Sequence, residues 1–204
     1  MSASKKTNNK NKNNQYSNCC VAFGSNVFSK LGSPLETIHQ AMEDIQTSEF
    51  ELLFTSNLYE TAAYPKDSGP DFINCCSVYR TKLNAFDTLL HLHKIEKSFG
   101  RIRNKRWGPR MIDLDLIYFD KLIYPNKEVV EEWMVLSKEK QMKSWPTEMI
   151  LPHPRLQDRA FVLVPMSDID PNWKHPILKN TVSEMIKNID SKLLIEIKKY
   201  KQIT

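Results

Sequence analysis

Hydrophobic and polar positions along this chain switch between the two-residue period of strands and the longer period of helices. The pattern predicts the order strand, helix, strand, strand, helix, strand. The strands are expected at residues 18–24, 50–60, 72–82 and 111–119, and the helices at residues 34–46 and 85–99. Helix signals agree with this order, because Ser33 and Pro34 open the first helix, Asn84 opens the second and Gly100 follows its end.

The second half of the chain is less regular. Residues 120–150 mix charges with two tryptophans and show no clear period, so we expect an insertion there. Residues 151–159 are a proline-punctuated loop, and helical stretches are expected near 181–189 and 191–200. The element order predicts one α+β domain over residues 18–204. Its expected architecture is a ferredoxin-like α/β sandwich with a mostly antiparallel sheet and flanking helices.

The first 17 residues form a Lys/Asn-rich segment with four lysines and no acid, and we expect a disordered tail. It lacks the apolar region of a secretory signal, and the chain has no run of about 18 apolar residues that would span a membrane. The four cysteines occur as two adjacent pairs, which favours buried, reduced thiols over a chelating C-x-x-C site. We therefore expect a cytoplasmic protein without membrane contact.

Positive charge is concentrated in one short segment. The chain carries +5 overall, and residues 94–110 alone contribute +6, with seven Lys and Arg side chains against Glu96. Because the positive charges are confined to one short segment, they favour a binding site for one compact anion over an extended nucleic-acid-binding surface. An RNA-binding module is a rival interpretation of a basic ferredoxin-like domain, but the aromatic signature of that class is absent from the sequence.

The predicted strand at 111–119 carries two acids one residue apart. Alternation places Asp113 and Asp115 on one face, and Ile112, Leu114, Leu116 and Tyr118 on the other. The two acids are then roughly 6.6–6.8 Å apart along the strand, a spacing that suits oxygen ligands of Mg²⁺. The alternative is a solvent-facing strand with two exposed acids. The adjacent basic segment favours a polyphosphate held by cations and arginine forks.

Two further clues are weaker when each is taken alone. Glu96 falls in the apolar arc expected for the 85–99 helix, formed by Ala85, Phe86, Leu89, Leu90, Leu92, Ile95 and Phe99. A carboxylate there either pairs with an arginine of the basic loop or lines a cleft. Phe72 and Asn74 share a strand face, where a ring and an amide could recognise a flat heterocycle, although a strand Phe is usually core. His153 and Arg159 stay ambiguous.

Several ordered segments together resemble one enzyme family. They are AFGSN at 22–26, SNLYET at 56–61, GPDFINC at 69–75, IEKSFGRIR at 95–103, RWGPRMIDLDLIYF at 106–119 and LPHPRLQDRAFVLVP at 151–165. The set is similar to 6-hydroxymethyl-7,8-dihydropterin pyrophosphokinase, an enzyme of folate biosynthesis, over roughly residues 20–190. The resemblance implies a kinase-type transferase that passes the β,γ-diphosphate of ATP to the pterin hydroxymethyl group, with release of AMP.

The resemblance also implies roles for single residues. Asp113 and Asp115 would bind two Mg²⁺ ions, and Arg101 and Arg110 would act on the phosphates. The expected nucleotide site further includes Glu96, Arg103, Trp107, His153 and Arg159. The expected pterin site includes Thr61, Tyr64, Phe72, Asn74 and Phe161. The expected partners are these two small molecules, with no nucleic acid and no membrane, and association with other folate enzymes is an open alternative.

Three departures from the family pattern bear on these expectations. Pro154 follows His153 where many relatives have a polar or aromatic residue, which puts the adenosine contacts there in question. Phe72 stands where tyrosine is common. The stretch from Asp115 to His153 is longer than in compact members. A nucleotidyltransferase with a Gly-Ser turn and a D-x-D pair is an enzyme alternative, but here the two elements lie almost ninety residues apart.

Overall fold

The computed structural model describes residues 16–63, 69–100, 110–144 and 146–201. Its centre is a six-stranded sheet in which every described strand pair is antiparallel. The strands are β1 (Ser17–Ser25), β2 (Phe50–Thr55), β3 (Tyr59–Thr61), β4 (Phe72–Thr81), β5 (Asp113–Phe119) and β6 (Lys198–Lys199). The order across the sheet is β5-β1-β4-β3-β6, and β2 also pairs with β4.

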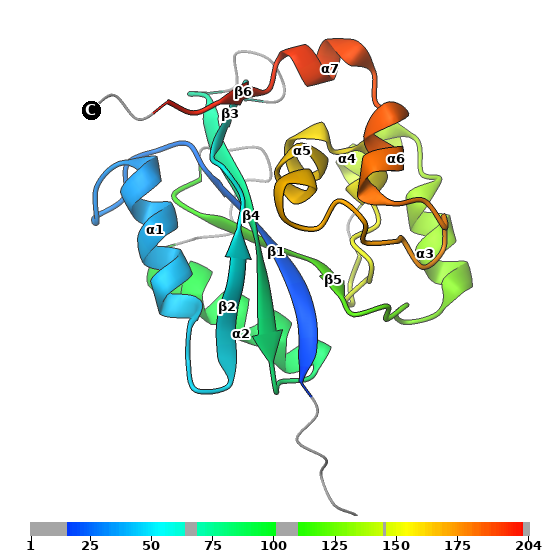
Figure 1. Cartoon of the computed structure of the whole chain (residues 1–204), viewed down its shortest axis with the longest axis horizontal. Helices are drawn as coiled ribbons and strands as arrows, with labels where there is room; N and C mark the ends of the chain where they lie inside the picture. The colour runs from blue at the N-terminus through cyan, green and yellow to red at the C-terminus, as the bar shows by residue number, and fades with distance from the viewer. Residues whose placement is uncertain (1–15, 64–68, 101–109, 145, 202–204) are drawn as a thin grey trace, which may run out of the picture.

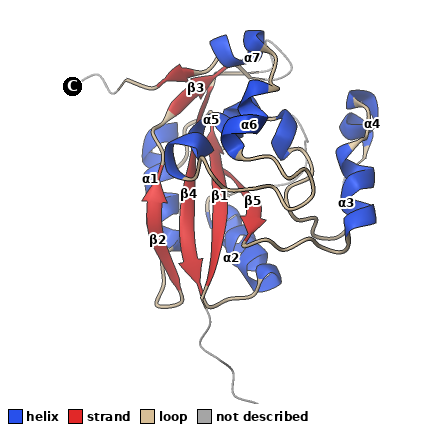
Figure 2. Ribbon diagram, turned by 45° about the vertical axis from the view of Figure 1, so that its right-hand side comes forward, coloured by secondary structure: helices blue, strands red, loops and turns tan. Residues whose placement is uncertain are grey.

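Helices cover both faces of the sheet (Figure 1). α1 (Pro34–Ile45) and α2 (Ala85–Ser98) pack on one face, and α5 (Ala160–Ile169) and α6 (Val182–Lys187) on the other (Figure 2). Each face has its own apolar cluster, because the side chains of β1, β4 and β5 alternate between the two layers. The predicted α+β class and antiparallel sheet are confirmed.

The helix signals of the sequence act as expected. Ser33 and Glu36 form a reciprocal capping box at the start of α1, with Pro34 in the first turn. The Asn84 side chain caps α2 by accepting a hydrogen bond from the Asp87 amide. Gly100 follows α2 with a φ of 84°, a left-handed conformation that glycine adopts without steric cost.

The buried face of α2 differs from the predicted arc. Phe86 and Leu90 are 57% and 41% exposed, so their assignment to the apolar arc was wrong. The buried face instead consists of Ala85, Thr88, Leu92, Ile95 and Glu96. Of this set, Glu96 lies within the predicted arc, whereas Thr88 lies outside it.

Two strands depart from simple alternation. The predicted strand at 50–60 is interrupted between β2 and β3, where residues 56–58 lie opposite only Cys75 and Cys76 of β4. In β5 the register shifts so that Val21 pairs with Leu116 but Cys20 pairs with Tyr118. This bulge turns both Ile117 and Tyr118 toward α5, so the predicted placement of Tyr118 beside Leu114 and Leu116 was wrong.

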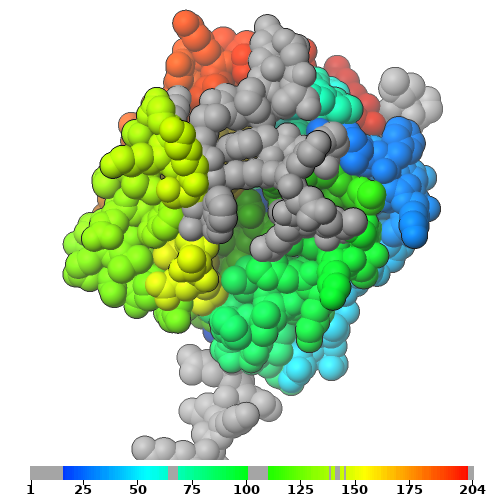
Figure 3. All heavy atoms as spheres, turned by 180° about the vertical axis from the view of Figure 1, so that it is seen from behind, coloured from blue at the N-terminus to red at the C-terminus, as the bar shows by residue number. Residues whose placement is uncertain are grey.

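The part after β5 holds the largest differences from the prediction. α5 was not predicted, because its sequence is apolar nearly all round and contains Pro165. The predicted helix at 191–200 is shorter, with α7 at Ser191–Ile195 followed by β6. The stretch expected to be an insertion carries α3 (Lys127–Met134) and α4 (Lys138–Lys143), and its yellow-green atoms gather on one side of the molecule (Figure 3).

All four cysteines are buried and unbonded to each other. Cys19 and Cys75 belong to the cluster beneath α1 and α2, whereas Cys20 and Cys76 belong to the cluster beneath α5. Burial raises the pKa of the Cys19, Cys75 and Cys76 thiols. The expectation of buried, reduced thiols is therefore confirmed, and their role is to fill the core.

Candidate active site

A row of side chains crosses four strands at one end of the sheet. Gly24 of β1 pairs with Asp113 of β5 on one side and with Asn74 of β4 on the other, and Asn74 pairs in turn with Tyr59 of β3. Directly opposed residues share a face, and here it is the face covered by α5. With strands about 4.8 Å apart, the acid and the amide are roughly 10 Å from each other, with the glycine between them.

Gly24 lies in the middle of this row, where neighbouring side chains come close to its Cα because glycine has no side chain. A Cβ atom at this position would lie 3.3 Å from the Asn74 Oδ1, 3.7 Å from the Phe72 Cδ1 and 3.9 Å from the Asp113 Cβ. The four residues therefore meet around one point. Side chains that were predicted to bind the pterin and the metal, on strands 40 residues apart in sequence, converge here.

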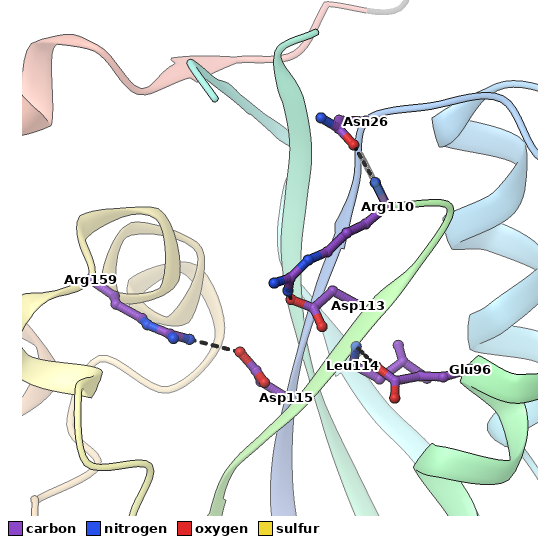
Figure 4. Close-up of polar contacts among 7 residues, drawn as sticks. All are labelled: Asn26, Glu96, Arg110, Asp113, Leu114, Asp115 and Arg159. Carbon is purple, nitrogen blue, oxygen red and sulfur yellow. Dashed lines mark hydrogen bonds and ion pairs between the residues drawn. The ribbon is translucent and has the colours of Figure 1, made fainter. Parts of the chain in front are cut away.

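Asp113 is paired with an arginine at the end of the basic segment. The Arg110 guanidinium donates to the Asp113 carboxylate from three residues away (Figure 4). Asn26 holds the backbone of Arg110 by two hydrogen bonds. The Arg110 backbone N–H donates to the Asn26 Oδ1 at 2.8 Å, and the Asn26 backbone N–H donates to the Arg110 carbonyl at 3.1 Å. The Asn26 Nδ2 also donates to the Pro70 carbonyl at 2.9 Å, so this buried amide joins the ends of two loops.

Asp115 is paired with a different arginine. The Arg159 Nη1 donates to the Asp115 Oδ2 at 2.7 Å, reaching it from the start of α5 (Figure 4). Burial by itself raises the pKa of the Asp115 carboxyl, but the Arg159 charge, helped by His153 and Arg110, holds the pKa well below its ordinary value. The carboxylate is therefore ionised throughout the neutral range.

The segment at 151–159 lies along the free edge of β5. The His153 amide donates to the Ile117 carbonyl at 2.8 Å, and Tyr124 and Leu151 form an isolated bridge beside it. The His153 Nδ1 accepts from the Arg155 amide, which leaves the proton of the neutral ring on Nε2. Burial and the neighbouring arginines lower the pKa of His153 to about 3, so the ring is neutral at physiological pH.

The aromatic and amide side chains form the other half of the site. The Asn74 Nδ2 donates to the Thr61 Oγ1 at 2.7 Å, which fixes the orientation of the amide and leaves its oxygen toward Gly24. Phe161 lies near the start of α5, 39% exposed, with the Arg159 guanidinium 5.6 Å from its ring centre. Whether Phe72 and Phe161 sandwich a ligand stays a prediction.

Glu96 approaches β5 from the opposite face of the sheet. It is 1% exposed, and its Oε1 accepts from the Leu114 amide at 2.8 Å (Figure 4). Leu114 lies between the two aspartates on an edge strand, where outward-pointing amides need partners from outside the sheet. The expectation that Glu96 points into the core is confirmed, and its carboxylate supports the strand that carries the acids.

The predicted metal site consists of two carboxylates and no more in the described part of the chain. Within residues 16–63, 69–100, 110–144 and 146–201, no group of three His, Cys, Asp or Glu side chains is placed to hold a metal ion. Two carboxylates fit Mg²⁺ that takes its remaining ligands from phosphates and water, which is how this ion is usually bound in nucleotide enzymes. The donor set fits a metal–nucleotide complex and not a free-standing metal cage.

The structure brings together most of the predicted site residues that it describes. Around the row lie Thr61, Phe72, Asn74, Arg110, Asp113, Asp115, His153 and Arg159. Arg101, Arg103, Trp107 and Tyr64 lie outside the described residues. The roles of Gly24 and Asn26 were not predicted, although both belong to the AFGSN segment that was singled out as a turn.

Comparisons with known proteins agree with one another. A family model described as 7,8-dihydro-6-hydroxymethylpterin-pyrophosphokinase (HPPK) matches residues 20–171. The chain is 31% identical over 171 residues to a 2-amino-4-hydroxy-6-hydroxymethyldihydropteridine pyrophosphokinase of Synechocystis sp., covering 83% of this chain and 75% of the relative. It is 32% identical over 185 residues to the folic acid synthesis protein FOL1 of Dictyostelium discoideum, covering 89% of this chain but 24% of that protein.

A similar solved structure is the Plasmodium falciparum HPPK-DHPS with pterin and p-hydroxybenzoate. The TM-score is 0.62 at 15% sequence identity, over 87% of this chain and 44% of the other. At 15% sequence identity, the similarity to this structure is evidence for the fold alone. The chain thus spans about a quarter of one relative and under half of this structure, but three quarters of the Synechocystis enzyme. Among the described helices, none is both long and apolar enough to cross a membrane.

Proposed function

Because the chain belongs to the 7,8-dihydro-6-hydroxymethylpterin-pyrophosphokinase family, we propose that it transfers the β,γ-diphosphate of ATP to 6-hydroxymethyl-7,8-dihydropterin. The products are AMP and the pterin diphosphate, an intermediate of folate biosynthesis. The observation that carries the proposal is the row from Asp113 through Gly24 to Asn74, which sets an acid–arginine cluster beside an amide that the Thr61 hydroxyl orients.

The acid–arginine cluster suits a polyphosphate. Arg110 and Arg159 each hold one aspartate, so two guanidinium groups are already fixed next to the carboxylates before any ligand arrives. Guanidinium forks bind phosphate oxygens with charge-assisted hydrogen bonds. Asp113 and Asp115 would hold Mg²⁺, which when bound neutralises phosphate charge and orients the nucleotide. Arg101, Arg103, Trp107, His153 and, through β5, Glu96 complete the proposed nucleotide side.

The amide end of the row suits a flat heterocycle. The Thr61 hydroxyl fixes the Asn74 side chain so that its amide presents a donor and an acceptor to a pterin edge. Phe72 lies beside Gly24 and offers a ring face, and Phe161 on α5 offers a second one. The backbone near Thr61 to Tyr64 supplies further hydrogen bonds in this proposal. The pterin hydroxymethyl group then points along the row toward the acids.

The reaction follows from this placement. The hydroxymethyl oxygen attacks the β-phosphorus, the bond from the β-phosphorus to the α-phosphate bridging oxygen breaks, and AMP leaves with that oxygen. The proton of the alcohol is lost to solvent or to a product phosphate. Phosphoryl transfer of this kind asks for positioning and charge stabilisation rather than covalent catalysis. The arginines supply the charge, and the Asn74–Phe72 slot supplies the position.

The direct test is incubation of the protein with ATP, Mg²⁺ and 6-hydroxymethyl-7,8-dihydropterin. We expect equimolar AMP and pterin diphosphate, resolved by anion-exchange chromatography. Release of ADP with a pterin monophosphate would show transfer of a single phosphoryl group, and no dependence of nucleotide cleavage on the pterin would show a different acceptor. Either result would overturn the proposal.

Two broader points belong to the same proposal. The absence of a membrane-crossing helix among the described residues, together with the small, charged substrates, supports action in the cytoplasm. The HPPK-DHPS relative and the much longer FOL1 relative support association with other folate enzymes. Size-exclusion chromatography of this chain mixed with the next enzyme of the pathway tests that association, and separate elution at micromolar concentration would refute it.

A further inference from the structure

The carboxylate of Asp168, near the end of α5, accepts hydrogen bonds from three donors on two residues, Asn57 just before β3 and Tyr59 in β3. The Asp168 Oδ2 accepts from the Asn57 amide at 3.0 Å and from the Asn57 Nδ2 at 2.8 Å. The Tyr59 hydroxyl donates to the same carboxylate, 3.0 Å from Oδ2 and 3.1 Å from Oδ1. None of these three residues contributes to the acid–arginine cluster.

The bulge between β2 and β3 creates this convergence. Ser56 is bonded to Cys76 of β4 by its amide and by its side chain, and the chain then uses one extra residue before Tyr59 pairs with Asn74. The extra residue lets Asn57 present both its backbone and its side chain to α5. Tyr59 lies on the same face as its cross-strand partner Asn74, which is the face that α5 covers.

On α5, Asp168 has a fixed relation to the proposed stacking residue. Phe161 and Asp168 are seven residues apart, so they lie on the same helix face about 10.5 Å from each other along the axis. Rotation of α5 about its axis would break the contacts of Asp168 with Asn57 and Tyr59. The same rotation would carry the Phe161 ring away from the slot.

We infer that Asp168 is a positioning residue that sets the orientation of α5 over Asn74, and through it the affinity for the flat pterin ring. The inference rests on the proposed function. Asp168 touches neither substrate; it acts by joining the helix that carries Phe161 to the strand that carries Thr61. The phosphate side is held separately, because Arg159 has its own ion pair with Asp115.

The Tyr59 hydroxyl is well suited to this link. Burial and the Asp168 carboxylate both raise the pKa of Tyr59, so the hydroxyl keeps the proton that it donates. Tyr59→Phe therefore removes one bond of the link and leaves the ring in place. Asp168→Asn keeps an acceptor but loses the charge, and Asp168→Ala removes all three bonds.

The chain offers a matched control on the same helix end. Asp170 follows α5, and its Oδ2 accepts from the Tyr118 hydroxyl at 2.6 Å. That bond ties α5 to β5 and has no contact with β3. Asp170→Asn is therefore the matched control for Asp168→Asn, because each variant keeps an acceptor and loses a charge at the same helix end, and Asp170 is bonded to β5 instead of β3.

The experiment measures the Michaelis constants for ATP and for 6-hydroxymethyl-7,8-dihydropterin by AMP release. It also measures dihydropterin binding by calorimetry in the presence of α,β-methylene-ATP, which cannot be cleaved. We expect Asp168→Ala to weaken pterin binding roughly tenfold, as expected for the loss of one to two net hydrogen bonds, with the ATP constant changed less than twofold. Asp168→Asn and Tyr59→Phe should each give a smaller effect, and Asp170→Asn none on the pterin.

Three results overturn the inference. One is unchanged pterin binding in Asp168→Ala while the wild type releases AMP, which would leave the proposed function standing. Another is a loss in Asp170→Asn as large as that in Asp168→Asn, which would assign the effect to general loosening of α5. The third is a Tyr59→Phe/Asp168→Ala double variant whose loss is the product of the two single losses, since a shared link requires non-additivity. If the wild type itself releases no AMP, the proposed function fails and the inference fails with it.

Discussion

Replacement of Gly24 by alanine tests the central row with the smallest possible change. The new Cβ would lie 3.3 Å from the Asn74 Oδ1, tighter than ordinary contact, and at normal distances from Phe72 and Asp113. The free protein can absorb this by a shift of a few tenths of an ångström in the Asn74 side chain. A gain of about 0.4–1 kcal/mol from reduced unfolded-state entropy opposes that strain, so we expect stability to change by less than about 1 kcal/mol.

The effect on pterin binding should be much larger. The methyl group lies between the Asn74 amide, the Phe72 ring and Asp113, and it pushes on the amide that Thr61 orients and that we propose to contact the pterin. Overpacking of this kind costs about 1–3 kcal/mol, so the pterin affinity should fall by roughly 5- to 150-fold. The Michaelis constant for ATP should change less than about threefold, because neither Arg110 nor Arg159 is among the nearest contacts of the added methyl group.

The assay combines AMP release at saturating ATP with urea unfolding. Gly69→Ala is the control for unfolded-state entropy, because its added Cβ would meet the Asn26 Nδ2 at an ordinary 3.5 Å and no other atom of the described residues within 4 Å. If Gly24→Ala keeps wild-type pterin affinity, the row does not line the pterin site. If it weakens ATP and pterin equally, the damage is general and the placement of the slot is again wrong.

Three other variants test separate parts of the site and core. Asp115→Asn should lower turnover by on the order of 10²-fold at saturating Mg²⁺, and unchanged turnover would contradict its assigned role. Arg110→Ala should reduce turnover more than pterin affinity, and a loss confined to pterin binding would refute its placement among the phosphates. Burial, with the Lys179 charge, lowers the pKa of His175 to about 4, so the unfolded chain takes up a proton below about pH 6.5 and the folded chain does not. This group should lower the free energy of unfolding by about 1.4 kcal/mol per pH unit as pH drops from 6.5 toward 4, in addition to the effect of His153. His175→Gln should reduce the slope measured by urea unfolding by that amount, and an unaltered slope would contradict the assignment to His175.

Local sequence patterns were sufficient for the strands that carry the acids and the amide. Asp113, Asp115, Phe72 and Asn74 lie on the face that two-residue alternation predicts, because these strand segments pair without irregularity up to Leu116. The helix caps could also be predicted from the sequence, because a capping residue and its partner are three residues apart. These are the parts of the structure whose determinants lie within a few residues.

The mistaken parts have determinants that are distant in sequence. The exposed Phe86 and Leu90 and the buried Thr88 show that the rotation of α2 is set by what it packs against and not by its own hydrophobicity. α5 has no amphipathic period, because its less buried side carries the apolar Phe161 and Val164 beside Asp168, while the sheet, α6 and the segment before it cover the rest. Neither fact is contained in a local window of sequence.

Two of the strand irregularities bring a later segment of the chain to the acid–amide row. The β5 bulge lies where the Ile117 carbonyl accepts from the His153 amide, which brings the segment leading to Arg159 alongside Asp115. The interruption between β2 and β3 lies where Asn57 and Tyr59 reach Asp168, more than 100 residues away. A regular strand at either place would turn these donors and acceptors away from the later segment. The two departures from alternation are therefore what join the second half of the chain to the site, and restoring regular pairing at either one should separate α5 from the row.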